Sequence, residues 1–494
     1  MLDLTNPKRI AIIGGGTAGW FAALTFRRLF SPAVEVTLIE APEIPIIGVG
    51  EGGLINLVDG LIRNNIAIDD FIQSTGATYK FGFLYEGWRG GGREDVFYHL
   101  FGGANIPEFE WLQDGCFPLL SARIAAGLPL HSCIPFFEAI ARHAPQAEMR
   151  ELLLTGKYGR PASFHFDAHR VATFLRTTAQ ARGVVHRSAR VEQFILDEQG
   201  YTRTLRLDGD MLEVDFVIDA SGLARIGIDK TYHAPWCSFA DFLLPDSAMP
   251  FHLPKAQENP ALVTRSTSMR SGWMWQIPLQ ERVGGGYVFS SQHTDAATAQ
   301  AEVEAYLGHR VEPKRVLRYN AGYFEKVWIN NVMALGLASG FVEPLEATSI
   351  GLMLEQLRNL ERLLANGGGI ISGRAIDEFN TGISKSWTGI RDFLRLHYDC
   401  PRDDTPFWRD VAASPLPRDY AELWQCFQRR TPRMCDIEPY EGSGWQGIFY
   451  MINWIFVAAP LGVIPPAAAL AELNRLPSAD RIKVNAYLKQ VMGG

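Results

Sequence analysis

The feature that most constrains this chain is a glycine-rich turn near its start. An apolar run at 8–13 leads directly into GGGTAGW, and a helical run at 18–30 follows. Glycines at the first, third and sixth positions of such a turn let the backbone approach a pyrophosphate, whose charge the helix N-terminus favours. The spacing therefore predicts a βαβ dinucleotide-binding unit. The residues assigned to the nucleotide are Gly14, Gly16, Thr17, Ala18 and Gly19.

The layout after this turn favours FAD over NAD. A second strand ends at Glu40, 21 positions after the last glycine, where an acidic side chain accepts from adenosine ribose hydroxyls. A Pro- and Gly-rich loop at 41–53 follows, and the chain returns to the sheet only through EVDFVIDASG at 213–222. This interrupted order resembles the FAD-binding fold of flavin monooxygenases. Their late GD segment corresponds to 333–341 here, which contains no Asp.

Composition excludes several classes of function. The 494 residues carry a net charge of −7 with dispersed basic residues, which argues against a nucleic-acid partner. The most apolar late segment, 454–473, contains three prolines, so we expect no membrane partner. The six cysteines form no metal-ligand cluster and predict free thiols and a cytoplasmic location. The oligomeric state stays open, a dimer included.

Two aromatic strands are candidates for the site. In GWMWQIPL, 272–279, Trp273 and Trp275 lie two apart and share one strand face. They form either part of a sheet core or a wall that shields a reactive group. The segment 77–88 alternates strictly, which predicts one strand with four aromatic rings on one face and Lys80 on the other.

The rest of the chain predicts an α/β fold with a mainly helical C-terminal cap. A long helix begins near Thr348, and the sequence after residue 375 is mostly helical and rich in Trp and Pro. We expect an FAD-binding and catalytic module at 1–375, with 103–150 as an optional part of the cap. The cap itself would span 376–494 on the substrate side.

Several motifs together resemble the flavin-dependent halogenases, typified by tryptophan halogenases. The run from Trp273 matches their W-x-W-x-I-P motif, and the resemblance covers about 8–365. The other matching segments are GVGE at 48–51, TYKFGF around Lys80, YHLFG at 98–102, HFDA at 165–168 and GFVEPLEAT at 340–348.

This resemblance implies a chemistry and a set of roles. A separate reductase would supply FADH2, which with O2 and chloride or bromide gives hypohalous acid. Trp273 and Trp275 would separate flavin and substrate, so that the oxidant travels as a small molecule to Lys80. The lysine either hydrogen-bonds hypohalous acid or, if burial lowers its pKa, forms a haloamine. Glu346 would stabilise the cationic arene and accept its proton.

The resemblance also assigns the remaining site residues. His99 and Phe101 would line the substrate pocket, and the backbone of Thr348 and Ser349 at a helix start would bind the halide. Tryptophan-specific members have Ser and Gly where this chain has Ala347 and Ser349. Further cofactor contacts are assigned to Gly50, Val191, Leu337 and Ile350.

The substrate is predicted to be an electron-rich, indole-like aromatic other than tryptophan, with bromide competing well. The Tyr/Glu lid that clamps the amino acid in tryptophan halogenases is not recognisable, and 438–451 holds its place with a different sequence. Two alternatives stay open, an aromatic hydroxylase of the flavin monooxygenase type and a catalytically silent FAD-binding module.

Overall fold

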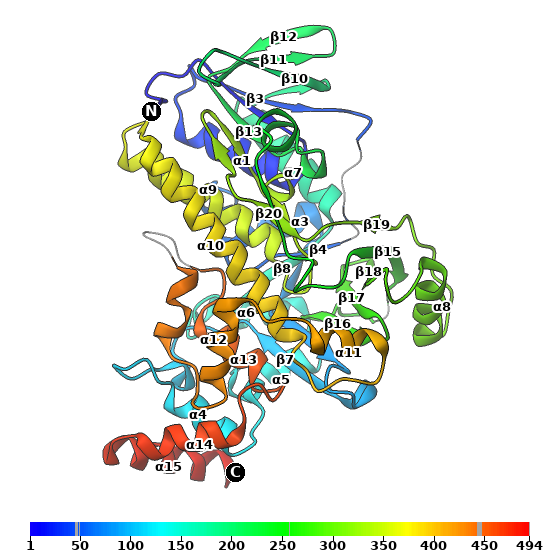
Figure 1. Ribbon diagram of the computed structural model, residues 1–494, viewed down its shortest axis with the longest axis vertical. Helices are drawn as coiled ribbons and strands as arrows, with labels where there is room; N and C mark the ends of the chain where they lie inside the picture. Colours follow the sequence, from blue (N-terminus) through cyan, green and yellow to red (C-terminus); the bar gives the residue numbers. More distant parts are fainter. Residues whose placement is uncertain (45–47, 49, 256, 442–446, 494) are drawn as a thin grey trace.

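The fold was described from a computed structural model, in which all residues except 45–47, 49, 256, 442–446 and 494 are described. The molecule is elongated, with the two chain ends at opposite ends of its long axis (Figure 1). A mainly parallel sheet lies at the N-terminal end, a large, mainly antiparallel sheet lies beside the middle, and short helices form the C-terminal end.

The nucleotide-binding sheet forms where the sequence predicts it. Its six strands have the order β21-β22-β13-β2-β3-β9, and the central strands are parallel. The predicted strand, helix and second strand are confirmed as β2, α1 and β3. The bounds are β2 (Arg9–Ile13), α1 (Thr17–Leu29), β3 (Glu35–Glu40), β9 (Val185–Ser188), β13 (Phe216–Asp219), β21 (Trp328–Ile329) and β22 (Val332–Ala334).

Smaller elements complete this end of the molecule. Helix α7 (Ala168–Ala181) follows Asp167, whose carboxylate caps it by accepting from the backbone N–H groups of His169 and Arg170. A three-stranded sheet of order β10-β11-β12 lies at the tip. Its strands are β10 (Val191–Leu196), β11 (Thr202–Leu207) and β12 (Asp210–Glu213).

The large sheet carries the tryptophan pair. Its order is β19-β15-β18-β17-β16-β6-β7. Met274 faces helix α8 (Ala296–Leu307) in a separate apolar cluster, so Trp273 and Trp275 face the opposite side. The strands are β6 (Gly82–Glu86), β7 (Val96–Leu100), β15 (Ser247–Pro254), β16 (Thr264–Met269), β17 (Gly272–Pro278), β18 (Arg282–Phe289) and β19 (Leu317–Arg318).

The single strand predicted at 77–88 is wrong. The chain forms β5 (Thr78–Lys80), which joins a small sheet with β4 (Glu51–Gly52) and β8 (Ser163–Phe166), and then moves into the large sheet as β6. Gly82 makes the change possible, because its φ of +140° and a Cβ position 2.3 Å from the His99 carbonyl oxygen exclude other residues. The bend brings Lys80 and Phe83, predicted on opposite faces, into contact.

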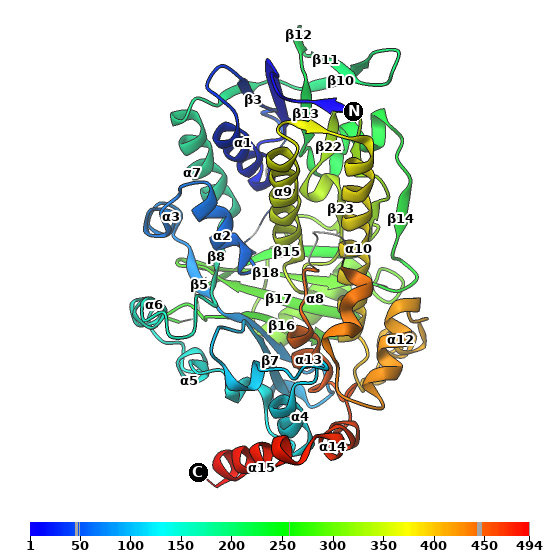
Figure 2. The same ribbon diagram turned by 90° about the vertical axis from the view of Figure 1, so that its left-hand side faces the viewer.

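Two long helices connect the two ends. Helices α9 (Thr348–Asn366) and α10 (Gly373–His397) lie side by side along the long axis (Figure 2). The first half of α10 is bonded to the nucleotide-binding part: the Asn380 amide oxygen accepts from the backbone of Val327 and Trp328 at 3.0 and 2.9 Å. The start of α9 near Thr348 is confirmed, whereas the division into modules at residue 375 stays a prediction.

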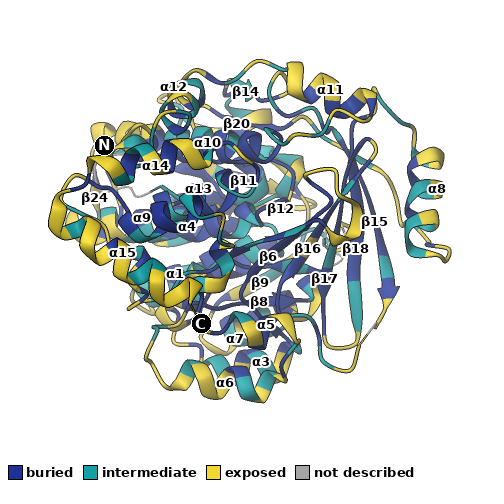
Figure 3. Ribbon diagram, turned by 90° about the horizontal axis from the view of Figure 1, so that it is seen from below, coloured by how far each residue is buried: buried dark blue, intermediate teal, exposed yellow. Residues whose placement is uncertain are grey.

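The part after α10 is mostly helical, as predicted. Its helices are α11 (Pro406–Ala413), α12 (Arg418–Phe427), α13 (Met451–Ala458), α14 (Pro466–Arg475) and α15 (Ser478–Met492). The remaining short helices are α2 (Asn56–Arg63), α3 (Ile68–Thr75), α4 (Pro118–Ala125), α5 (Phe137–Ala141) and α6 (Gln146–Leu154). Exposed residues concentrate on the outer faces of α6, α8 and α15, while the strands between them are buried (Figure 3).

Two further predictions concern the whole chain. All six cysteines are free, as expected. None of the helices in the described part of the chain combines the length and apolar character needed to cross a bilayer.

Candidate active site

Lys80 lies at the end of β5 with its whole side chain buried. Its Nζ lies 3.9 Å from the centroid of the Phe83 ring and 5.7 Å from that of Phe101. Within the described residues, this nitrogen has no hydrogen-bond partner. Burial lowers the pKa of the Lys80 ammonium to about 7, and the Glu346 carboxylate offsets only part of that effect. Lys80 therefore offers a buried amine whose hydrogen-bonding capacity is available to a ligand.

Glu346 lies in the loop before α9, and its side chain is also buried. Its Oε1 accepts from the Tyr85 hydroxyl and lies 2.9 Å from His99 Nδ1 and 3.0 Å from His397 Nε2. Its Oε2 has no partner among the described residues. Burial alone would raise the pKa of this carboxyl, but the two histidines outweigh burial and hold the pKa at about 2. Glu346 is thus a carboxylate with one oxygen held and the other open.

His397 on α10 contacts Glu346 through one ring nitrogen and its own helix through the other. Its Nδ1 lies 2.8 Å from the Phe393 carbonyl oxygen, and its Nε2 lies 3.0 Å from Glu346 Oε1. The Tyr85 hydroxyl lies 3.1 Å from the same Nε2, so Tyr85 and His397 meet at one oxygen of Glu346.

Aromatic rings bring the lysine and the carboxylate into one cluster. The Phe83 and His99 rings are stacked with centroids 6.0 Å apart, and Phe83 also meets Phe101 edge-on at 6.1 Å. Asn453 on α13 places its Nδ2 3.0 Å from His99 Nε2. The structure therefore brings together Lys80, His99, Phe101 and Glu346, the four residues assigned to the substrate side from the sequence.

The tryptophan pair is buried on β17. Trp273 and Trp275 are 0% and 7% exposed, and their ring centroids lie 6.2 Å apart. Trp275 lies flat over Gly286 of β18, where an added Cβ would approach two ring carbons at 2.1 Å. Trp273 Nε1 donates to Glu343 Oε2 at 2.6 Å, and the Tyr398 hydroxyl donates to the same oxygen at 2.6 Å.

Five residues of this cluster are absent from the predictions made on sequence. Glu343 could have been found, because it shares the EPLE segment with Glu346. Tyr85 lies on the predicted aromatic strand, but only the bend at Gly82 turns it toward Glu346. The remaining three come from the C-terminal third, where the motif resemblance gives no signal: His397, Tyr398 and Asn453.

The glycine turn has the space that a dinucleotide requires. A Cβ on Gly14 would lie 2.2 Å from the Ala220 carbonyl oxygen, and one on Gly15 would lie 1.4 Å from the Glu40 carboxylate. A Cβ on Gly16 would meet nothing within 4 Å, and α1 begins there with no side-chain cap. The turn therefore leaves open backbone and an uncapped helix N-terminus, so these residues fit FAD.

Other residues assigned to the cofactor lie in different places. The short helix η6 (Gly336–Ala338), which carries Leu337, lies against the turn, since a Cβ on Gly336 would come within 3.0 Å of Ala18 Cβ. Gly50 lies against β18, and Val191 begins β10. Ile350 lies in the first turn of α9. The assignment of these residues and of the glycine turn to the cofactor stays a prediction.

The N-terminus of α9 has the character of an anion site. Ala347 precedes it with a left-handed φ of +52°, and no side chain caps the helix. Thr348 is 1% exposed, and its Oγ1 has no partner within the described residues. Ser349 follows, half-buried. The unpaired N–H groups and the Thr348 hydroxyl are donors that a halide could accept.

The segment in place of the amino-acid lid is only partly described, because 442–446 lie outside the described residues. Of its described part, Phe449 stacks on Phe393 with centroids 3.8 Å apart. Just beyond it, Trp454 packs against Phe393 and Tyr440. The segment thus adds aromatic rings beside His397.

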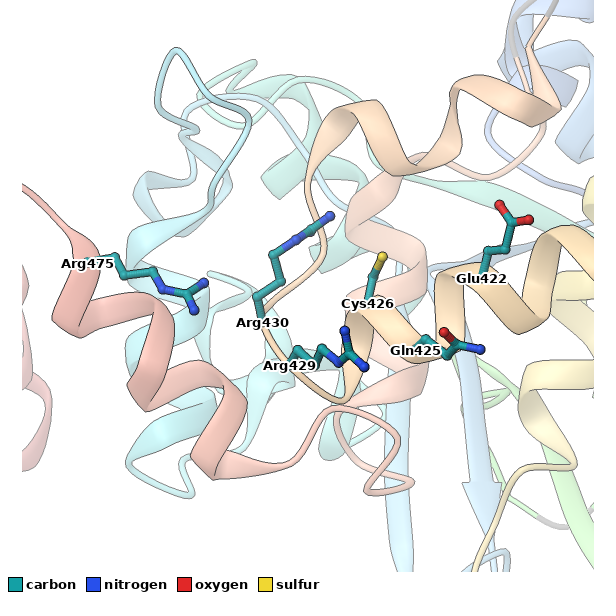
Figure 4. A pocket seen from close by; sticks show the side chains of 6 residues that line it. All are labelled: Glu422, Gln425, Cys426, Arg429, Arg430 and Arg475. Atoms are coloured by element: carbon teal, nitrogen blue, oxygen red, sulfur yellow. The ribbon is translucent and has the colours of Figure 1, made fainter.

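A separate surface hollow lies between α12 and α14 (Figure 4). Its volume is about 470 Å³, and it contains none of the residues named above. Six residues, most of them exposed, line it: Glu422, Gln425, Cys426, Arg429, Arg430 and Arg475.

Comparisons of the sequence and of the structure with known proteins both find halogenases. The tryptophan halogenase family profile matches residues 9–474. The uncharacterized protein y4xG of Sinorhizobium fredii is 54% identical over 493 residues, covering 100% of this chain and 97% of its own length. Tryptophan 7-halogenase RebH of Lentzea aerocolonigenes is 31% identical, covering 95% and 92%. Among solved structures, Xcc4156, a flavin-dependent halogenase from Xanthomonas campestris, superposes with a TM-score of 0.81 and 30% identity, covering 98% and 96%.

Proposed function

Since this chain belongs to the tryptophan halogenase family, and is therefore a flavin-dependent halogenase, we propose that it halogenates an indole-like aromatic other than free tryptophan. Reduced FAD would come from a separate flavin reductase. The observation that carries the proposal is the buried cluster in which Lys80 and the open oxygen of Glu346 lie among aromatic rings.

Residues of the N-terminal turn would hold the cofactor. Gly14, Gly16 and the start of α1 would take the pyrophosphate, and Glu40 would accept from the adenosine ribose. When bound, reduced FAD supplies the chemistry that turns O2 and a halide into hypohalous acid. Thr348 and Ser349 would hold the halide at the N-terminus of α9.

Trp273 and Trp275 would separate this chemistry from the substrate. A wall of two buried indoles keeps the aromatic substrate from the cofactor, so only a small oxidant passes. At the far side, Lys80 would bind that oxidant through its unpaired Nζ. With a pKa of about 7, both the ammonium and the amine are populated near neutral pH, and so both roles considered for this lysine are supported.

Glu346 would act on the arene. Electrophilic attack leaves a cationic ring, which the carboxylate stabilises and from which Oε2 can accept the proton. A carboxylate with a pKa of about 2 is a weak base, but a cationic arene is a strong acid, so this transfer is favourable. Tyr85, His99 and His397 hold the other oxygen and so fix the direction in which Oε2 points.

The surroundings support an aromatic substrate without a charged amino-acid group. The rings of Phe83 and Phe101 lie near Lys80, and Phe449 and Trp454 pack against Phe393. The side chains that contact Glu346 are those of Tyr85, His99 and His397. Such a lining suits indoles. Bromide should compete well with chloride, because it is the more easily oxidised halide.

A halide-competition assay on a panel of indoles, phenols and pyrroles tests this proposal. Purified protein, a flavin reductase, FAD and NADH would be combined with equal chloride and bromide, and products identified by mass spectrometry. We expect brominated indoles, with indole reacting faster than tryptophan. Oxygenated products formed without halide would indicate a hydroxylase, and chlorinated tryptophan as the dominant product would contradict the substrate and halide assignments.

The Lys80→Ala variant tests the site of oxidant transfer. Because Lys80 would act after hypohalous acid forms, the variant should reoxidise added FADH2 at the wild-type rate yet halogenate almost nothing. Stopped-flow absorbance of the flavin and product analysis in parallel would measure both. Loss of FADH2 reoxidation would instead make Lys80 a flavin-side or structural residue.

A further inference from the structure

A second buried acid lies three residues before Glu346 and has no role in the chemistry proposed above. Glu343 is 1% exposed. Its Oε2 accepts from both Trp273 Nε1 and the Tyr398 hydroxyl at 2.6 Å, while its Oε1 has no partner among the described residues. Burying a carboxyl group in a protein interior costs free energy. The position of Glu343 against Trp273 therefore needs an explanation.

The loop that carries both acids is held from two sides. On one side, consecutive residues at the end of α10 bind it: His397 contacts Glu346, and Tyr398 donates to Glu343. On the other side, the large sheet binds it through Tyr85 and Trp273. The indole of Trp273 is therefore fixed relative to the carboxylate that faces the substrate.

The charge around Glu343 differs from that around Glu346. Its surroundings are the neutral side chains of Trp273, Tyr398, Tyr85 and Tyr319, and within the described residues no cation pairs with it. Burial raises the pKa of Glu343 to about 7, although both hydrogen bonds lower it. The two donors are thus the main support of this carboxylate.

We infer that Glu343 is a positioning residue that fixes the indole of Trp273 and thereby directs the oxidant to Lys80 instead of letting it escape. This rests on the proposed function. Without Glu343, the Trp273 N–H would lose the carboxylate acceptor that fixes it, and the ring would turn toward another acceptor. Turning a wall residue opens or closes the passage that the wall defines.

The positioning role of Glu343 is tested by measuring coupling, which is the amount of halogenated product formed per FADH2 consumed. In Glu343→Ala, FADH2 should be reoxidised at the wild-type rate, while halogenated product per FADH2 consumed should fall about fivefold or more. Escaped hypohalous acid, trapped with an added β-diketone, should rise correspondingly. Glu343→Gln keeps an acceptor for Trp273 and should recover much of the coupling, and Tyr398→Phe should show an intermediate loss.

A spectroscopic measurement tests the hydrogen bond without any turnover. With 15N-labelled tryptophan, the protein has at most twelve indole N–H signals, and Trp273→Phe identifies the one that belongs to Trp273. We expect Glu343→Ala to move this signal strongly upfield, because a short hydrogen bond to a carboxylate deshields the proton. Glu343→Gln should move it less.

Asp392→Asn is the matched control. This buried acid accepts from the Tyr440 hydroxyl at 2.9 Å and makes no contact with the wall. It should leave both coupling and the Trp273 signal unchanged. If Glu343→Ala fails to fold, Glu343→Gln and Tyr398→Phe carry the test.

The outcomes separate the two proposals. An unmoved Trp273 signal in the Glu343 variants would overturn the hydrogen bond. A moved signal with wild-type coupling would overturn the positioning role. A wild-type protein that halogenates nothing in the panel would overturn the proposed function and the coupling role with it, while the signal would still report the hydrogen bond.

Discussion

Two carboxyl groups three residues apart have opposite electrostatic surroundings. Two histidines hold the pKa of Glu346 at about 2, whereas burial among neutral groups raises the pKa of Glu343 to about 7. Lys80, also with a pKa near 7, adds a third buried ionisable group. Buried groups with such displaced pKa values concentrate at functional sites.

The burial of Lys80 should be visible in the pH dependence of stability. Between the folded pKa of about 7 and the ordinary value of 10.5, the unfolded chain binds more protons, so stability should rise with pH. The shift amounts to a penalty on the order of 5 kcal/mol below pH 7, of which about 3 kcal/mol should disappear between pH 6 and 9. Lys80→Met lacks this penalty, so its advantage over wild type in urea unfolding should shrink across that range. An advantage that stays constant would mean that Lys80 is solvated.

Glu346→Gln should separate charge from shape. The amide keeps the size of the side chain but loses the charge that stabilises a cationic arene. A preorganised electrostatic contact of this kind is worth roughly 3 kcal/mol, or about a hundredfold in rate. Single-turnover halogenation with preformed FADH2 would measure it. A wild-type rate would reduce Glu346 to a carboxylate that stabilises the start of α9.

The end of α10 brings His397 into contact with Glu346, with its Nε2 3.0 Å from Oε1. His397→Asn should lower halogenation roughly tenfold, because a charge-assisted hydrogen bond is lost. The pKa of Glu346 should also rise from about 2 toward its ordinary value. Activity should therefore fall as the pH drops below about 5 in the variant but not in wild type. A pH–rate profile measures this, with His293→Asn, which contacts Asp410 away from the site, as control.

Gly286 on strand β18 leaves the space that the ring of Trp275 occupies. Gly286→Ala would place a methyl group 2.1 Å from two carbons of the indole, so the ring must move. We expect unchanged FADH2 reoxidation but less product per FADH2. Gly373→Ala, where a Cβ meets nothing within 4 Å, is the control. Equal coupling in both variants would show that the position of Trp275 does not matter for transfer.

Sequence periodicity predicted the elements that are continuous and locally determined. The βαβ opening, the strand that carries Trp273 and Trp275, and the start of α9 lie where the sequence pattern places them. The single strand at 77–88 failed, because alternation continues through Gly82 although the backbone turns into another sheet there. His397 and Tyr398 could not be predicted, since only the path of α10 brings them to Glu346 and Glu343.

For the molecule as a whole, the described part shows one glycine turn of the dinucleotide type, at 14–19, which the cofactor itself would use. We therefore expect the purified protein with FAD and substrate to oxidise NADH no faster than a protein-free control. Addition of a flavin reductase should start both NADH consumption and halogenation. Absorbance at 340 nm follows the first. Efficient NADH oxidation by this chain alone would contradict the requirement for a separate reductase.

The course of α10 limits how this enzyme can be recombined with its relatives. The helix has 25 residues, roughly 37 Å, with Asn380 bonded to the nucleotide-binding part and His397 at the buried acids. In a chimera that takes all residues after 375 from a relative, in order to alter the substrate, His397 would be replaced along with the pocket. Glu346 would then meet the relative's residue in its place. A junction after Tyr398 would exchange the helices beyond it and keep both acids with their native donors.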